Sequence, residues 1–306
     1  AITVQALLFG AGIGFVIQHL TFQRATGIFW TIPQEVLFYL LLPGLVVLHP
    51  FVFRRNHFAT IAGLAPVDRE RVFAVVATSG TTNAGIVDDL AGVADVCDDN
   101  ELWFHVDGAY GAAALAAPSA RSRFNGIERA DSLIIDPHKW LFSPFDCCAL
   151  IYRDPRIARA AHTQHAEYLE VLQGDEWNPS DYAHHLSRRA RGLPLWFSLA
   201  THGTDAYADA VETTLDATRT AARLIDDCPV TELLLEPELS IVLFRRVGWT
   251  TEQYQAWSDA ELAAGRCFVV PTTWQGEVVL RLCIVNPRTT GDDIASILAT
   301  LAEEGS

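Results

Sequence analysis

From residue 66 onward, short apolar runs alternate with segments of helical spacing, and this alternation constrains the fold more than any other feature. Four runs have the length and apolar character of buried strands, at residues 72–78, 102–106, 132–135 and 148–152. Residues 88–98, between the first two runs, have the spacing of a helix. Strands that alternate with helices form a mainly parallel sheet. We therefore expect an α/β fold here.

Polar motifs follow three of these expected strands. SGTT (79–82) follows the first strand, DGAYG (107–111) follows the second, and DPHKW (136–140) follows the third. In parallel sheets, ligands bind beyond the carboxyl ends of the strands. We therefore expect the three motifs to meet at one edge of the sheet and to form a ligand site.

A second α/β region is expected towards the C-terminus. Residues 205–227 predict a long amphipathic helix, and helices are also expected from about 250 and from about 290. Strands are expected at residues 231–235, 240–247, 267–271 and 278–285. We interpret residues 206–306 as a smaller α/β domain.

Lysine is nearly absent from the chain. Lys139 is the one lysine among 22 basic residues, and all the others are arginine. An amine can lose its proton when it is desolvated, whereas a guanidinium keeps it. Lys139 and Asp107 each lie beyond a strand end, and this pair suits pyridoxal 5'-phosphate, with a Schiff base on the amine and a carboxylate at the ring nitrogen. Ala109 offers a small surface to a flat ring, and Thr82 offers a hydrogen bond to cofactor or substrate.

The runs TSGTTNAGIVDDL, LWFHVDGAYG and DPHKWLFSPFDCCALIYR together resemble the pyridoxal-phosphate-dependent amino-acid decarboxylases of the aromatic-amino-acid and glutamate decarboxylase group. The resemblance covers about residues 66–306. It implies a partial fold-type-I large domain over 66–205 and a small C-terminal domain over 206–306. It makes Lys139 the Schiff-base lysine and Asp107 the partner of the ring nitrogen. It also places Ala109 against the ring and Thr82 close to the cofactor.

The same resemblance implies four further site residues. Asp136 and His138 lie at the rim of the cofactor, although the family often has Asn where this chain has Asp136. In NPSDYAHH, Tyr182 matches the catalytic proton donor of a mobile loop. In VLRLCIVNP, Arg281 matches the arginine that binds a substrate carboxylate.

The resemblance implies decarboxylation of an L-amino acid by a homodimer. Transamination and aldehyde formation on the same cofactor are alternatives. A truncated or fused chain without activity is a third, because the family's phosphate-cradling loop and its ring-stacking histidine are missing from this sequence. The chain has no methionine and begins with alanine, which favours a fragment or a processed form.

Residues 1–56 predict an apolar helical segment. Residues 4–20 and 36–53 are uncharged runs, and each approaches the ~20 residues that a membrane-spanning helix needs. Residues 30–48 resemble one helix of a family of membrane acyltransferases. Membrane contact through residues 1–55 and a buried hydrophobic hairpin are the two interpretations of this segment.

Charge and cysteine content limit the partners and the compartment. A net charge of −15 excludes a broad electrostatic interaction with nucleic acid. The six cysteines have no paired spacing, which predicts reduced thiols in a cytoplasmic protein and no metal site.

Overall fold

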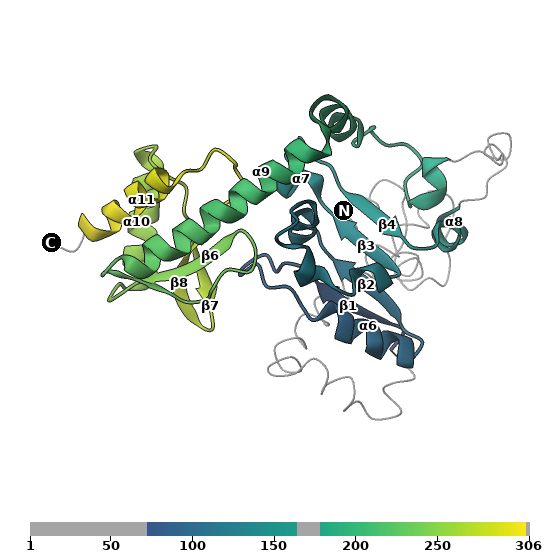
Figure 1. The fold of residues 1–306 in the computed structure, drawn as a ribbon, viewed down its shortest axis with the longest axis horizontal. Coiled ribbons are helices and arrows are strands. Elements are labelled where there is room, and N and C mark those ends of the chain that lie inside the picture. The colour runs from purple at the N-terminus through teal and green to yellow at the C-terminus, as the bar shows by residue number, and fades with distance from the viewer. Residues whose placement is uncertain (1–71, 164–177, 304–306) are drawn as a thin grey trace, which may run out of the picture. The chain divides into compact units, whose positions relative to one another are not determined.

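The computed structural model describes residues 72–163 and 178–303 (Figure 1). The chain divides into two units, Glu70–Ala158 with Arg188–Ser306, and Ala1–Arg69 with Arg159–Ser187. The expected apolar segment at residues 1–56, and with it the membrane contact, lies outside the described residues. Within the described ranges, no helix combines the length and the apolar character that a membrane crossing requires.

The first sheet has the strand order β1-β2-β3-β4. Its strands are β1 (Ala74–Thr78), β2 (Trp103–Asp107), β3 (Ser132–Ile135) and β4 (Ala149–Tyr152). The first three are parallel, and β4 runs antiparallel to β3. The structure therefore confirms the α/β fold and the mainly parallel sheet.

Short helices follow the strands of this sheet. The α-helices are α6 (Leu90–Asp99), α7 (Pro137–Trp140) and α8 (Pro155–His162). The 3-10 helices between these strands are η2 (Gly111–Ala116), η3 (Arg121–Phe124) and η4 (Ile127–Arg129). A further 3-10 helix, η6 (Pro179–Tyr182), belongs to the other unit. Asp89 caps α6 by accepting a hydrogen bond from the Gly92 N–H at 3.0 Å. Leu90, Val93 and Ala94 turn towards the sheet and are buried in its core.

Trp140, the last residue of the third motif, is buried in this core. The side chain is fully buried, and its ring stacks on that of Tyr110 with 5.3 Å between centroids. The indole N–H donates to Thr214 Oγ1 at 3.0 Å. Burial of large apolar side chains contributes about 1.5–3 kcal/mol each. Trp140 therefore fixes α7, which carries Lys139, against the helix that contains Thr214.

That helix, α9 (Leu193–Asp227), begins earlier than the sequence pattern predicts. Gly203 has φ 77° and ψ 164°, so two helices meet at a break there. The second of them corresponds to the amphipathic helix expected at 205–227. Its inward residues include Val211, Leu215 and Ile225, which are all buried.

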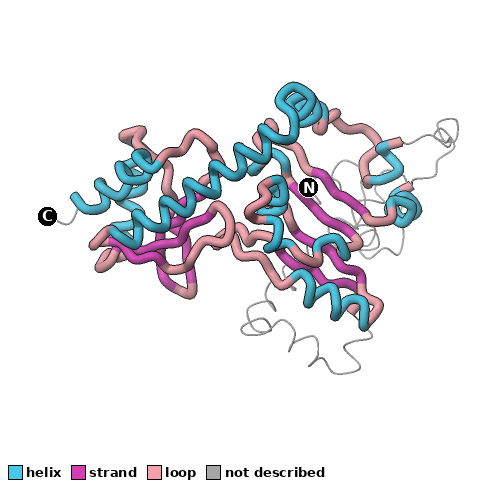
Figure 2. The backbone as a smooth tube through the Cα atoms, viewed as in Figure 1, coloured by secondary structure: helices cyan, strands magenta, loops and turns pink. Residues whose placement is uncertain are grey.

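The second sheet is antiparallel, with the strand order β5-β6-β8-β7. Its strands are β5 (Thr231–Leu233), β6 (Ile241–Arg246), β7 (Pro271–Trp274) and β8 (Glu277–Cys283). Helices α9, α10 (Thr251–Ala263) and α11 (Gly291–Glu303) cover one face of this sheet (Figure 2). The capping box expected from Thr250 and Gln253 forms at the start of α10.

The strand expected at 267–271 is wrong. β7 begins at Pro271 because it pairs with β8 through a tight turn, in which Trp274 faces Glu277. Gln275 and Gly276 in this turn both have positive φ, at 51° and 90°, as a two-residue hairpin requires. Residues 267–270 lie before this pairing, and Val269 is buried in the core of the second sheet. The apolar run indicated burial and not strand pairing.

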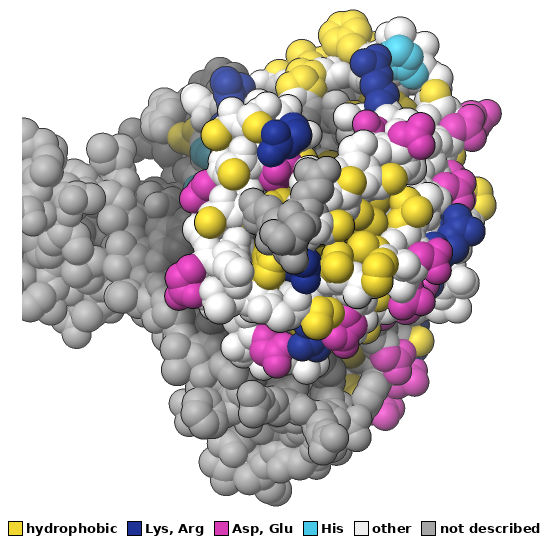
Figure 3. Space-filling view, turned by 90° about the vertical axis from the view of Figure 1, so that its left-hand side faces the viewer, with side chains coloured by type: hydrophobic (Ala, Val, Ile, Leu, Met, Phe, Trp, Pro, Cys, Tyr) yellow, Lys and Arg dark blue, Asp and Glu magenta, His cyan; other side chains and the backbone are white. Residues whose placement is uncertain are grey.

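The surface around the second sheet is mixed in character. Seen from the side of this sheet, apolar side chains gather near the middle of the described surface, with acidic and basic side chains around them (Figure 3). The exposed apolar residues of this region include Leu262 and Phe268.

Candidate functional site

The carboxyl ends of β1, β2 and β3 bring the three polar motifs together. Thr78 pairs with Asp107 in register, and Asp107 pairs with Ile134. The Ser79 N–H donates to the Asp107 carbonyl at 2.8 Å, and the Gly108 N–H donates to the Ile134 carbonyl at 3.0 Å. The expected convergence of the motifs at one sheet edge is therefore confirmed.

Glycines let the first two motifs approach each other closely. A Cβ on Gly111 would lie 2.1 Å from the Ser79 carbonyl oxygen and 2.7 Å from Gly80 Cα. Gly80 has φ +107°, which L side chains rarely adopt. Backbone therefore packs on backbone between these turns, which fixes their separation.

A chain of contacts connects Asp107 to Lys139. The Ala109 N–H donates to Asp107 Oδ1 at 3.1 Å. The Asp136 N–H donates to the Ala109 carbonyl at 3.1 Å. Asp136 Oδ2 then lies 2.9 Å from Lys139 Nζ. The structure thus joins four residues that the sequence singled out, through three successive contacts.

The ion pair between Lys139 and Asp136 lies partly in solvent. The Lys139 side chain is 40% exposed and the Asp136 side chain is 14% exposed. A partly exposed amine is accessible to a small molecule. The carboxylate and the ammonium group attract each other, and solvent weakens this attraction.

Cys148 also belongs to this cluster, although sequence analysis did not select it. Ile135 pairs with Ala149 in the antiparallel register, which places Cys148 opposite Asp136. Desolvation of the sulfur, followed by its interaction with the Asp136 carboxylate, raises the pKa of Cys148 to about 12. Sequence analysis missed Cys148 because the pattern does not show that β4 runs antiparallel to β3. A parallel strand would not place Cys148 opposite Asp136.

Arg281 reaches the SGTT turn from the second sheet. Its Nη2 donates to the Thr82 carbonyl at 2.7 Å, across 199 positions of sequence. Its Nε is buried and has no hydrogen-bond partner within the described ranges. The structure thus places Arg281 beside Thr82, through the backbone and not the side chain of Thr82.

His138 and Tyr182 are placed differently. His138 Nδ1 lies 2.6 Å from the Cys147 carbonyl oxygen, so the loop before β4 holds its ring. Tyr182 ends η6 and belongs to the unit that contains Arg159–Ser187. There Asp181 pairs with Arg159 at 3.1 Å. The structure therefore defines the position of Tyr182 within its own unit, and the catalytic role of Tyr182 stays a prediction.

Burial also shifts the pKa of two residues on either side of Asp107. Desolvation lowers the pKa of His105, and the nearby Asp107 carboxylate opposes that shift. Tyr110, which follows the motif, has its pKa raised by burial. Its hydroxyl hydrogen-bonds the Oγ of Ser240, the residue before β6, and this bond connects the start of η2 to the second sheet.

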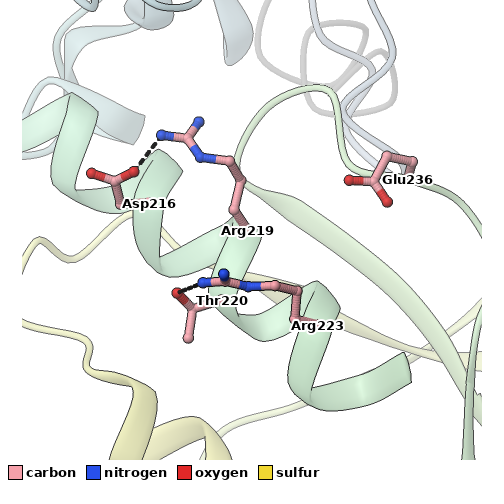
Figure 4. A pocket seen from close by; sticks show the side chains of 5 residues that line it. All are labelled: Asp216, Arg219, Thr220, Arg223 and Glu236. Carbon is pink, nitrogen blue, oxygen red and sulfur yellow. Dashed lines mark hydrogen bonds and ion pairs between the residues drawn. The ribbon is translucent and has the colours of Figure 1, made fainter. Parts of the chain in front are cut away.

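A surface hollow on α9 lies apart from these motifs in sequence. It is lined by Asp216, Arg219, Thr220, Arg223 and Glu236 (Figure 4). Within it, Arg219 pairs with Asp216 and Arg223 donates to Thr220 Oγ1 at 3.1 Å. None of the expected site residues lines this hollow.

The strand-end cluster fits pyridoxal phosphate at two of its functional groups. Lys139 offers an accessible amine for the aldehyde. Among residues 72–163 and 178–303, the Asp107 carboxylate accepts one hydrogen bond, from the Ala109 N–H, and its second oxygen is available there to a protonated ring nitrogen. The methyl group of Ala109 is the smallest side chain that a flat ring can pack against. The donor set therefore suits this cofactor.

Comparison with known proteins gives a consistent picture. The "Pyridoxal-dependent decarboxylase conserved domain" matches residues 64–247. An aromatic-L-amino-acid decarboxylase of Bacillus atrophaeus is 32% identical over 250 residues, which cover 78% of this chain and 52% of the relative. A 3,4-dihydroxyphenylacetaldehyde synthase of Aedes aegypti is 33% identical over 224 residues, which cover 72% of this chain and 42% of the relative.

A solved structure shows the same fold. The structure of Oryza sativa TDC with PLP and tryptamine superposes with a TM-score of 0.68 at 27% identity, covering 75% of this chain and 50% of that one. The chain thus spans about half the length of the relatives that it matches. The family domain covers more than half of the chain. The chain belongs to the pyridoxal-dependent decarboxylase family.

Proposed function

We propose that the protein decarboxylates an L-amino acid with pyridoxal phosphate held on Lys139. The observation that carries this proposal is the contact chain from Asp107 through Ala109 and Asp136 to Lys139. It joins the chain's one lysine to a carboxylate beyond the neighbouring strand. The names of the relatives, most of which are decarboxylases, support the same reaction.

Pyridoxal phosphate, when bound, draws electrons from the substrate's alpha carbon through its protonated ring. Asp107 would pair with the ring nitrogen, because an adjacent carboxylate favours the charged form of the ring. Lys139 would hold the cofactor through its aldehyde. Ala109 would leave room for the ring. Asp136 and His138 line the rim of the site.

Substrate handling falls to two further residues. Arg281 binds the substrate carboxylate, and its position beside Thr82 supports this role because it lies at the same turn as the SGTT motif. Tyr182 returns a proton to the alpha carbon after carbon dioxide leaves. We also propose a homodimer, which light scattering on the purified chain tests. A cytoplasmic location stays a prediction.

Product analysis tests the reaction. The chain is incubated with pyridoxal phosphate and with aromatic, acidic and diamino L-amino acids in turn. We expect carbon dioxide and the corresponding amine in equal amounts, and none with the Lys139→Ala variant. Absence of product from every amino acid, with cofactor bound, contradicts the proposal and favours a chain without activity.

Aldehyde formation is the second candidate function; it is an oxidation that would consume dioxygen and water and release carbon dioxide, ammonia and hydrogen peroxide. The similarity to the 3,4-dihydroxyphenylacetaldehyde synthase of Aedes aegypti favours it. An aldehyde in place of the amine, with a Tyr182→Phe variant that keeps full activity, supports this candidate. An amine product that disappears in Tyr182→Phe supports decarboxylation. An oxo acid as the product identifies transamination.

A further inference from the structure

The carboxylate of Asp136 lies at the start of α7 and does not cap it. Asp136 has the extended backbone of an N-cap residue, with φ −109° and ψ 92°. An Asp at this position usually accepts a hydrogen bond from the second or third N–H of the helix. Asp136 makes no such bond. Its acceptor capacity is directed to other groups.

Two side chains interact with the Asp136 carboxylate instead. Lys139 Nζ lies 2.9 Å from Asp136 Oδ2. Cys148, the residue before β4, lies opposite Asp136 in the extended register, and its thiol interacts electrostatically with the same carboxylate. Asp136 thus pairs with the Lys139 amine from the turn after β3.

We propose that Asp136 is a positioning residue for the Lys139 amine, and that it acts on this amine and not on the cofactor phosphate. The proposal rests on the proposed function, in which Lys139 holds the cofactor. A carboxylate beside a phosphate repels it, whereas a carboxylate beside an ammonium group attracts it. Asp136 thereby holds the amine in place until a ligand arrives.

The reactivity of Lys139 in the cofactor-free chain tests the proposal. An ammonium group must lose a proton and leave its ion pair before the amine can attack an electrophile. Asp136→Asn removes the charge and keeps the size of the side chain. We expect acetic anhydride at mildly alkaline pH to label Lys139 roughly two- to fivefold faster in this variant, as befits a partly exposed ion pair. Lys139 is the one lysine of the chain, so peptide mass spectrometry reads its labelling directly.

Asp216→Asn is the matched control. It removes the same charge from an ion pair on α9, where Asp216 contacts Arg219. We expect its Lys139 labelling rate to equal that of the unaltered chain. An unchanged rate in Asp136→Asn overturns the proposal, and so does an equal increase in both variants, because the effect would then reflect net charge alone.

A pair of aldehydes separates action on the amine from action on the phosphate. Pyridoxal and pyridoxal phosphate share the aldehyde and ring, and only the second carries the phosphate. We expect Asp136→Asn to accelerate capture of both by the same factor. Acceleration of pyridoxal phosphate alone means that the carboxylate faces the phosphate, which overturns the proposal. If the unaltered chain captures neither aldehyde, the proposed function fails, and the labelling result still decides the role of Asp136.

A measurement on the unaltered chain replaces the variant if Asp136→Asn does not fold. Salt screens a partly exposed ion pair, since the Debye length falls to a few ångströms near 1 M. We therefore expect the rate of Lys139 labelling to rise with salt concentration. A rate that stays constant overturns the proposal.

Discussion

Gly111 is the position where a single methyl group has the largest expected effect on the site. In Gly111→Ala, the new Cβ would lie 2.1 Å from the Ser79 carbonyl oxygen and 2.7 Å from Gly80 Cα. Both neighbours are backbone, so neither can swing aside as a flexible side chain would. Overpacking of this kind costs about 1–3 kcal/mol, and we expect a value near 3 kcal/mol.

Urea unfolding measures this loss. With a slope of about 2 kcal/mol per molar, a loss near 3 kcal/mol lowers the urea midpoint by roughly 1.5 M. Cofactor affinity should fall as well, because the SGTT and DGAYG turns are forced apart. Gly192→Ala is the matched control, since a Cβ there meets nothing within 4 Å. We expect it to change stability by no more than about 1 kcal/mol. A Gly111→Ala chain as stable as this control would refute the close packing of the two turns.

Three further predictions concern other parts of the structure. Trp140→Phe should lower the free energy of unfolding, measured with urea, by about 2–3 kcal/mol, because it leaves a gap and removes a hydrogen bond to Thr214. A decrease of less than about 0.5 kcal/mol contradicts this. Asp107→Asn should weaken pyridoxal phosphate binding about tenfold in an absorbance titration, with stability unchanged, because a neutral amide loses a charge-assisted hydrogen bond; unaltered affinity contradicts it. A hydrogen bond from Arg266 lowers the pKa of Glu261. This pair therefore stabilises the fold fully at pH values above the usual pKa of a glutamate, and the stabilisation is lost as the pH falls through the lowered pKa. Glu261→Gln should therefore be less stable at neutral pH and lose less stability in acid, whereas parallel pH profiles contradict this.

Local patterns predicted the parts of the fold that depend on local physics. The runs at 102–106 and 132–135 became β2 and β3 because apolar segments of that length are buried wherever they pair. The three polar motifs met because parallel strands end at one edge. The capping box at Thr250 needs only residues three positions apart, and it too was predicted.

Long-range pairing was not accessible to the same reasoning. The antiparallel direction of β4, which sets Cys148 opposite Asp136, depends on the chain reversing after α7. The hydrogen bond between Arg281 and Thr82 joins two sheets. Nothing in either segment alone encodes such a contact. The apolar run at 267–270 likewise indicated burial, while the tight turn at Gln275 decided which residues pair.

Borohydride reduction in the presence of pyridoxal phosphate tests the role of Lys139 most directly. Reduction fixes the cofactor permanently to the amine that holds it, and peptide mass spectrometry then locates the added mass. We expect the label on the peptide that contains Lys139, and no label on that peptide in the Lys139→Arg variant. A chain that binds pyridoxal phosphate tightly while the Lys139 peptide stays unlabelled would contradict the account.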